Sequence, residues 1–391
     1  MDFSESNLLF RWLGFKGVWD QIQGEVQRGV KRSLERIMQA ELKEQVGCER
    51  YQRRKCRCGY RNGTYARDLL TSYGWIGGLA VPRPRHGGLQ TRAFERYRRR
   101  QRQLDAVILE TFLLGLSTRK TRRAFRRVFG ADLSAQAVSN VVHELDSEVK
   151  AFHRRPLGND YRFVYLDGLH LSVRTPVKTK KVLLIAVGIK ADGRSEIISF
   201  QVVNQESEST WWGFVGDLKQ RGLYGGQLEV IVSDGNAGLI KATQAHYPRL
   251  RRQRCTFHQA MDLAQHCEQS RHKKRIVLDA RHIFNAETHT EVRERLRGFI
   301  QKWQEKEPKA VRNLLKGFDA CLVYLDYAEP WRSKLKTNNP IERTIEELNR
   351  RLIPMRSLNN VKSIERIVYG IVAFVLNQYQ DVPECQFTQN A

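Results

Sequence analysis

The stretch Phe163-Val164-Tyr165-Leu166-Asp167-Gly168-Leu169-His170-Leu171 decides the fold, because one acidic residue interrupts a long apolar run. Aromatic and β-branched residues favour a strand, and a run that is apolar on both faces is typical of a strand inside a sheet. A second run, Val230-Ile231-Val232-Ser233-Asp234-Gly235, also ends in Asp-Gly. Each run therefore predicts a carboxylate at or near the end of a buried strand.

Strand and helix patterns alternate around these two runs. The patterns predict strands at 163–173, 182–189, 196–203, 228–232 and 253–257, and helices from Ser209 or Thr210 and over 237–246. Residues from about 259 to 330 show only helical patterns, and two helices at 341–351 and 363–378 follow. This order predicts an α/β fold, with a ribonuclease-H-like catalytic core that is split by an all-helical insertion.

A mostly helical, basic region precedes this core. Residues 1–50 have helical spacing, 51–86 form a basic β or loop element with a turn at Arg61-Asn62-Gly63-Thr64, and 104–114 is an apolar helix. Ser117 and Gly130 delimit a helix that ends at Phe129, and Ser134 opens another that reaches about Val149. Two helices across a short turn have the spacing of a helix-turn-helix.

Six regions follow from these patterns. They are an N-terminal helical and basic β or loop region (1–92) and a helix-turn-helix region (93–157), both expected to bind DNA, the first part of the expected catalytic core (158–258), a helical insertion (259–333), the final core helices with the candidate catalytic Glu (334–380) and a loose tail (381–391).

The charge of the chain indicates a polyanionic partner. The 391 residues include 67 Lys and Arg but only 42 Asp and Glu, which gives a formal net charge of +25. Hydrophobic residues make up 41% of the chain, a share that predicts a folded protein. We expect DNA contacts from the basic residues of the first helix-turn-helix helix and of the β element: Arg119, Lys120, Arg122, Arg123, Arg126, Arg127, Arg83 and Arg85. For the helix, a merely solvated face is the alternative interpretation.

Location follows from what the sequence lacks. No apolar run approaches the roughly 20 residues of a membrane span. The N-terminus is acidic, unlike a secretory signal, and seven scattered cysteines are typical of reduced thiols. We therefore expect a cytoplasmic, nucleoid-associated protein without a membrane partner.

Three acidic residues are candidate metal ligands: Asp167, Asp234 and Glu342. Two carboxylates on neighbouring strands and one on a nearby helix can hold Mg²⁺ for displacement at a phosphodiester. Asp167 and Glu342 each have an alternative interpretation, whereas the helical pattern after Asp234 leaves it no hairpin partner. Apolar residues around Asp167-Gly168 are also a hairpin signature, and Glu342 falls at the capping-box position of a helix with Asn339 as N-cap and Pro340 at N1. Spacing alone does not separate Glu342 from Glu346.

A Cys-x-x-His pair, Cys255-Thr256-Phe257-His258, is the next candidate feature. A structural zinc site needs four ligands, and Cys56-x-Cys58 and His266-Cys267 are weak second pairs. We favour His258 as a proton donor or positive charge near DNA. Trp211 and Trp212 are expected to pack in the core, with base stacking as the alternative.

These motifs together resemble bacterial insertion-sequence transposases of the Mutator type, which carry a DDE triad. The resemblance covers about residues 59–378. It rests on Arg61-Asn62-Gly63, Val81-Pro82-Arg83-Pro84-Arg85, Gly115-Leu116-Ser117-Thr118-Arg119-Lys120, Tyr165-Leu166-Asp167-Gly168, Ser233-Asp234-Gly235 with Gly238-Leu239, Arg254-Cys255-Thr256-Phe257-His258 and Thr337-Asn338-Asn339-Pro340-Ile341-Glu342-Arg343.

The resemblance implies that Asp167, Asp234 and Glu342 are the catalytic metal ligands, with His258 as an accessory residue, and thereby selects Glu342 over Glu346. It implies Mg²⁺, with Mn²⁺ as a substitute, and double-stranded DNA as partner, both terminal inverted repeats and target. Pairing of two DNA ends implies a homodimer or larger assembly. The expected function is strand cleavage and strand transfer. A non-catalytic DNA-binding regulator and a metal-dependent nuclease without strand transfer are the alternatives.

Overall fold

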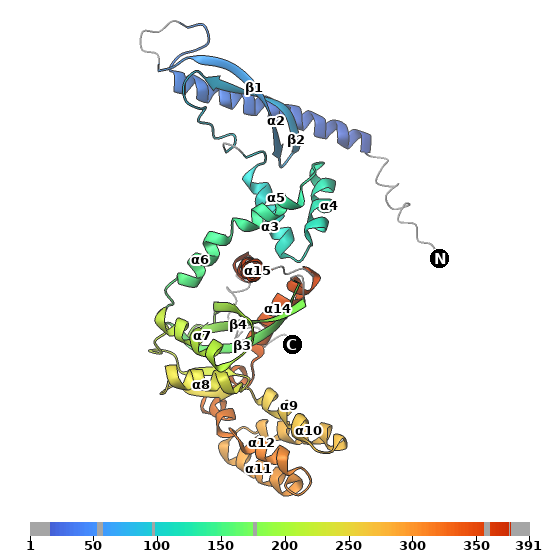
Figure 1. Ribbon diagram of the computed structural model, residues 1–391, viewed down its shortest axis with the longest axis vertical. Coiled ribbons are helices and arrows are strands. Elements are labelled where there is room, and N and C mark those ends of the chain that lie inside the picture. The colour runs from blue at the N-terminus through green and yellow to red at the C-terminus, as the bar shows by residue number, and fades with distance from the viewer. Residues whose placement is uncertain are drawn as a thin grey trace, which may run out of the picture. The chain divides into compact units, whose positions relative to one another are not determined.

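The computed structural model describes residues 16–52, 58–95, 98–174, 178–355, 360–374 and 376 (Figure 1). The chain divides into two compact units. Unit 1 comprises residues 1–112 and 116–142, and unit 2 comprises residues 113–115 and 143–391. The six regions predicted above are a finer division and stay predictions. Cys56, residues 356–359 and the predicted tail at 381–391 lie outside the described residues.

Unit 1 begins with a long helix beside a β-hairpin (Figure 1). Helix α2 (Lys16–Val46) packs against strands β1 (Arg61–Thr71) and β2 (Gly74–Pro84) through Met38, Leu69 and Leu79, which are all fully buried. The turn predicted at 61–64 is wrong, because these residues start β1 and Gly63 takes a positive φ of 70° where the strand register shifts. The chain reverses instead between Thr71 and Gly74.

Four helices follow, α3 (Arg102–Leu113), α4 (Thr118–Phe129), α5 (Ala135–His143) and α6 (Asp146–Arg154). The predicted bounds of α4 are confirmed. Ser117 Oγ accepts the Lys120 N–H, and Gly130, at φ 66°, donates its N–H to the Arg126 carbonyl. The single helix predicted from Ser134 to about Val149 is wrong, since two turn residues at 144–145 separate α5 from α6.

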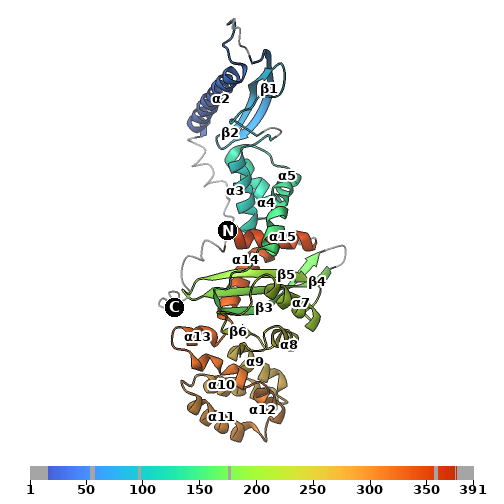
Figure 2. The same ribbon diagram turned by 90° about the vertical axis from the view of Figure 1, so that its left-hand side faces the viewer.

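The core of unit 2 is a five-stranded mixed sheet (Figure 2). Its strands are β3 (Tyr161–Arg174), β4 (Lys178–Lys190), β5 (Ser195–Val203), β6 (Val230–Ser233) and β7 (Arg251–Arg254). They lie in the order β5-β4-β3-β6-β7. The β3–β4 and β4–β5 pairs are antiparallel, whereas β3–β6 and β6–β7 are parallel. Strand β7 ends at Arg254, earlier than the predicted strand at 253–257, because Thr256 already starts a helix.

Alternation along β3 gives its two faces different neighbours. Val164 and Leu166 belong to the apolar cluster that contains Trp211 and Leu239, from helices α7 (Glu208–Gln220) and α8 (Ala237–His246). On the other face, the Tyr165 hydroxyl donates to the Lys334 carbonyl at 3.1 Å. The core position of Trp211 is confirmed, but Trp212 is 48% exposed. The cap of α7 is Ser207, upstream of the predicted Ser209 or Thr210.

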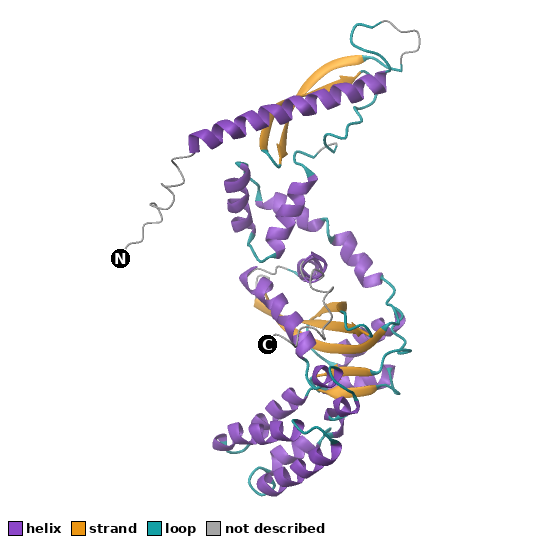
Figure 3. Ribbon diagram, turned by 180° about the vertical axis from the view of Figure 1, so that it is seen from behind, coloured by secondary structure: helices purple, strands orange, loops and turns teal. Residues whose placement is uncertain are grey.

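The remainder of unit 2 is helical. Within the described residues, no strand occurs after β7 (Figure 3). The helices are α9 (Thr256–His266), η1 (Ser270–His272), α10 (Lys273–Phe284), α11 (His289–Trp303), α12 (Pro308–Leu315), η2 (Asp319–Cys321), η3 (Val323–Asp326), α13 (Trp331–Leu335), α14 (Asn339–Met355) and α15 (Val361–Phe374). Across the described part of the chain, none of the helices is long and apolar enough to span a bilayer.

Candidate active site

Asp167 lies in the middle of strand β3. Its Cα partner in β4 is Ile185, so the hairpin interpretation is wrong, and the expectation that this carboxylate ends a strand is wrong as well. The Asp-Gly signal misled because the pairing partner of β3 comes later in the chain. The parallel ladder of β3 with β6, however, ends at Leu166 and Ser233. Asp167 therefore lies one residue past the carboxyl end of β6, where open α/β sheets place ligands.

Asp234 directly follows β6, as predicted. Its Oδ1 accepts the N–H of Asn236 at 2.9 Å, and the Asn236 side chain in turn accepts the N–H groups of Gly238 and Leu239 at the start of α8. The Asp234 carboxylate is thus held at the strand-to-helix turn. Pairing of Leu166 with Ser233 makes Asp167, on β3, and Asp234, just after β6, neighbours at the end of this parallel ladder.

Glu342 lies in the first turns of α14. This helix begins one residue earlier than predicted, because Ile341 and Glu342 donate their N–H groups to the Asn338 carbonyl. The Asn338 N–H donates to Cys255 Sγ, and the Asn339 N–H donates to Thr337 Oγ1, each at 3.4 Å. The Glu342 carboxylate has no hydrogen bond to a backbone N–H within the described residues. The capping-box interpretation is therefore wrong.

The electrostatics of Asp167 show that these acids lie close together. Burial is the largest cause, and together with the negative charges of Asp234, Glu342 and Glu206 it raises the pKa of Asp167 to about 7, although the Gly168 N–H that donates to its Oδ1 opposes this rise. Glu346 is exposed and is not among these neighbours. The structure thus brings together the three predicted acids and adds a fourth.

Glu206 is the acid that sequence reasoning missed. Its Oε1 accepts hydrogen bonds from Trp211 Nε1 at 3.0 Å and from Asn236 Nδ2 at 2.9 Å, and its side chain is 18% exposed. Its Oε2 lies 3.3 Å from the position that a Cβ on Gly168 would take. The available signal was an acid immediately before Ser207, the N-cap of α7, at the end of a strand-to-helix connection.

His258 lies beside Glu342. Its Nδ1 is 3.9 Å from Glu342 Oε1. The start of α9 is tied to the approach to α14, because Thr256 donates both its N–H and its hydroxyl to the Lys336 carbonyl, at 3.1 and 2.9 Å. Burial is the main cause that raises the pKa of the Cys255 thiol to about 11. The Cys-x-x-His pair therefore adjoins Glu342.

The predicted DNA-contacting residues lie in unit 1, where they are exposed. Helix α4 buries Thr121 and Phe125 and turns its six basic side chains to solvent, although Arg122 and Arg126 pair with Asp132. Arg83 and Arg85 are exposed on and after β2, and the Arg83 guanidinium lies over the Tyr65 ring.

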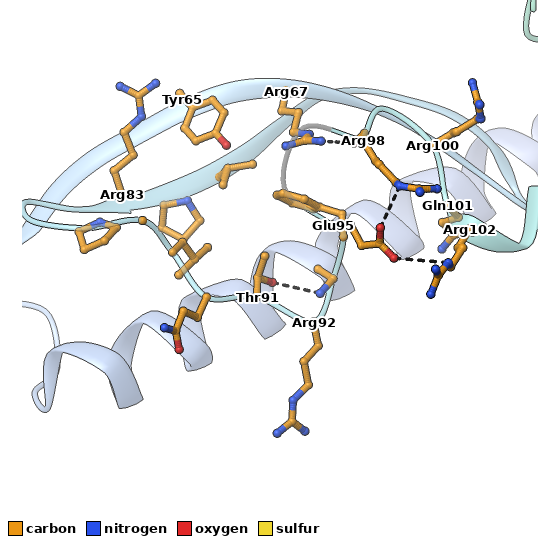
Figure 4. Close-up of a pocket in the computed structure, with 18 of the residues that line it drawn as sticks. Tyr65, Arg67, Arg83, Thr91, Arg92, Glu95, Arg98, Arg100, Gln101 and Arg102 are labelled. Atoms are coloured by element: carbon orange, nitrogen blue, oxygen red, sulfur yellow. Dashed lines mark hydrogen bonds and ion pairs between the residues drawn. The ribbon is translucent and has the colours of Figure 1, made fainter. Parts of the chain in front are cut away.

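A basic cavity of about 1000 Å³ adjoins Arg83 in unit 1 (Figure 4). Part of its positive charge is neutralised, since Glu95 pairs with Arg98 at 2.9 Å and with Arg102 at 3.7 Å. Arg92 points away from these ion pairs (Figure 4). The lining is rich in guanidinium groups, which suit phosphate. Its basic side chains are Arg67, Arg83, Arg92, Arg98, Arg100 and Arg102.

An α/β unit that gathers carboxylates, joined to a unit with exposed arginines, defines a candidate DNA-processing protein. The family model of the Mutator family of transposases matches residues 16–381. The chain belongs to this family. It is similar to the transposase for insertion sequence element ISRM5 of Rhizobium meliloti, with 32% identity over 88% of this chain and 85% of that one. A transposase for insertion sequence element IS256 in transposon Tn4001 of Staphylococcus aureus is 30% identical over 90% of this chain and 93% of that one.

Among solved structures, one chain of the simian T-cell lymphotropic virus intasome in complex with the PP2A regulatory subunit B56 gamma is similar over 53% of this chain and 64% of that chain, with 13% identity and a TM-score of 0.18. A likeness at that level carries no argument about the fold.

Proposed function

We propose that the chain is a DDE transposase that binds the terminal inverted repeats of its insertion sequence and catalyses metal-dependent strand cleavage and strand transfer. The observation that carries the proposal is the convergence of Asp167, Asp234 and Glu342 from β3, the end of β6 and α14. A protein that only binds DNA has no use for three gathered carboxylates within a chain of +25 net charge.

The sheet supports the ribonuclease-H-like part of the proposal. Three antiparallel strands are followed by two short parallel ones, and the proposed ligands lie on the central strand and its parallel neighbour. Residues 259–333 then form the proposed helical insertion, after which α14 returns to the sheet beside β3 and β4 with Glu342. We propose this insertion as the scaffold that sets the distance between the second Asp and the Glu.

The donor set fits Mg²⁺, with Mn²⁺ as a substitute. Both ions prefer oxygen ligands, and a divalent charge would offset the repulsion that raises the pKa of Asp167 to about 7. Asp167, Asp234 and Glu342 would hold the metal. When bound, Mg²⁺ supplies Lewis acidity at the scissile phosphate and the leaving oxygen.

The remaining residues orient this site and shape its charge. Glu206 couples the Asn236 side chain to Trp211, and so fixes the turn that carries Asp234. Arg254 donates to the Asp234 carbonyl at 3.5 Å and pairs with Asp262 at 2.7 Å. His258, half-exposed beside Glu342, places a proton donor where a scissile phosphate would approach. The cleaved 3′-hydroxyl then attacks a second phosphodiester, without a covalent protein–DNA bond.

The basic residues of α4, Arg83 and Arg85 are proposed to position the DNA. Guanidinium and ammonium contacts to phosphates supply affinity, and fewer base contacts supply sequence recognition. Two transposon ends must be paired, so we propose a homodimer or larger assembly on DNA, in the bacterial cytoplasm at the nucleoid.

A donor-plasmid assay tests the proposal. Each donor plasmid carries the coding region with its native flanking DNA, as wild type, Asp234→Asn or Glu346→Gln. The DNA junctions that each protein forms are then sequenced. Glu346 is the matched control, because it is an exposed acid one turn beyond Glu342 on α14. We expect joined junctions or circles from wild type and Glu346→Gln only.

Two other results would replace the proposal. Cleaved ends without joining would make the protein a metal-dependent nuclease. Equal binding of the flanks by all three proteins, without any product, would make it a non-catalytic regulator.

A further inference from the structure

Cys255, His258 and Glu342 form a compact group of three different ligand types. One ligand atom from each, a sulfur, a ring nitrogen and a carboxylate oxygen, lie within 4.8 Å of one another. Cys255 precedes α9, His258 follows within its first turn, and Glu342 comes from α14. A zinc site built on the Cys-x-x-His motif needs further ligands. The third ligand is a Glu from a helix far along the chain.

Backbone N–H groups point at the sulfur of Cys255. Cys255 is fully buried, and its Sγ receives the N–H of Asn338 at 3.4 Å together with the backbone N–H groups of Phe257 and His258. Backbone donors directed at a sulfur at a helix N-terminus stabilise a thiolate. These donors hold the sulfur in a fixed position beside His258 and Glu342.

His258 presents a nitrogen that lacks a partner. Its Nδ1 is shielded from solvent and has no hydrogen-bond partner within the described residues, since Glu342 Oε1, at 3.9 Å, is too distant to accept. The side chains of His258 and Glu342 are each 36% exposed, so an ion can reach the group from solvent. A cation between Nδ1, Oε1 and Sγ would satisfy this buried nitrogen.

We propose that Cys255, His258 and Glu342 form a site for a thiophilic divalent cation of the Zn²⁺ class. Binding breaks the S–H bond, releases the proton to solvent and forms a metal–sulfur bond without oxidation. Three protein ligands leave a fourth position for water, and sulfur with imidazole selects Zn²⁺ or Co²⁺ over Mg²⁺.

The two ligand sets share Glu342, so a thiophilic cation competes with the oxygen-ligated site for this carboxylate. The consequence for activity, inhibition of strand transfer by Zn²⁺ in excess Mg²⁺, rests on the proposed function. Binding itself does not, because it is observed without DNA.

Titration of the metal-free full-length chain with Co²⁺, followed by absorption, tests the site. A thiolate ligand gives a near-ultraviolet sulfur-to-cobalt charge-transfer band, which an oxygen-only site lacks. We expect this band in wild type, and we expect added Zn²⁺, but not excess Mg²⁺, to remove it. Cys255→Ser should abolish the band while its hydroxyl still accepts the Asn338 N–H.

Three further variants keep the test decisive. Cys321→Ser removes another fully buried thiol and should leave the band unchanged. His258→Gln should weaken Co²⁺ affinity by at least about 10-fold, the loss that even outer-shell partners cause. Asp167→Asn should keep the band, although it should abolish strand transfer, so failure of the proposed function leaves this site measurable. The proposal is overturned if wild type shows no such band, or if Cys255→Ser retains it.

Discussion

Replacement of Asp167 by Asn should make the metal-free protein more stable at pH 8. Burial and the neighbouring carboxylates raise the pKa of Asp167 from its ordinary value to about 7 in the folded protein. At pH 8 Asp167 is ionised in both states, but its charge is unfavourable only in the folded protein, where the carboxylate is partly buried beside other acids. Asn removes this charge, and its Oδ1 can still accept the Gly168 N–H, which donates to Asp167 at 2.7 Å.

The magnitude follows from the pKa difference. An unfolded Asp titrates near pKa 4, and about 1.4 kcal/mol accompanies each tenfold change in acidity, so the difference corresponds to an upper bound of roughly 4 kcal/mol. Solvent screening reduces this figure, since the side chain is only partly buried. Because the folded pKa is raised, wild-type stability falls as pH rises from about 4 to 7 and is constant above. The gain from Asn should follow the same curve.

The assay is calorimetric unfolding of wild type and Asp167→Asn in EDTA at pH 8 and pH 5. We expect a higher Tm for the variant at pH 8, by roughly 2–4 °C for each kcal/mol in a unit of this size, and a smaller difference at pH 5. Mg²⁺ should raise the Tm of wild type but not of the variant. Equal Tm values in EDTA at pH 8, or a difference that grows on acidification, would refute the reasoning.

Three other predictions concern positions outside the triad. Glu206→Gln should raise the Mg²⁺ concentration for half-maximal cleavage by about 10- to 100-fold, because Glu206 orients the turn that carries Asp234. Substitution of the exposed Glu208 by Gln should leave that concentration unchanged, and a Mg²⁺ titration of cleavage compares the two variants. The double variant Arg123→Ala, Arg127→Ala on α4 should reduce the slope of log affinity against log salt by about 1 for each DNA phosphate that it no longer neutralises. Fluorescence anisotropy with flank DNA measures this slope, and an unchanged slope would mean that α4 does not contact the DNA. Ser117→Ala should cost unit 1 about 1 kcal/mol in denaturant unfolding, and an unchanged stability would contradict its role as N-cap.

Local chemistry made part of the fold predictable from sequence. Ser117 and Gly130 delimit α4 by side-chain and backbone hydrogen bonds within one helical turn, and both were identified correctly. The strands β3, β4 and β5 were recognisable because they are long and apolar. The break between α5 and α6 was not, because no Gly or Pro marks it.

The site depended on tertiary contacts that spacing cannot supply. Asp167-Gly168 has the local signature of a hairpin, and only its pairing with β4 shows an uninterrupted strand. Glu342 and Glu346 lie one turn apart, and of these two only Glu342 lies close enough for its charge to raise the pKa of Asp167. Glu206 carries no motif at all, and its place is set by hydrogen bonds to Trp211 and Asn236.

The position of Glu342 late in the chain gives the protein a built-in order during translation. Unit 1, with its basic helix, leaves the ribosome first, and about a hundred residues separate Asp234 from Glu342. At bacterial synthesis rates that interval lasts roughly 5 to 20 s. A nascent or prematurely terminated chain therefore exposes its proposed DNA-binding surface before the third carboxylate exists. Such chains would bind transposon ends without cutting them. A truncated chain would therefore compete with the full-length protein for the same DNA ends.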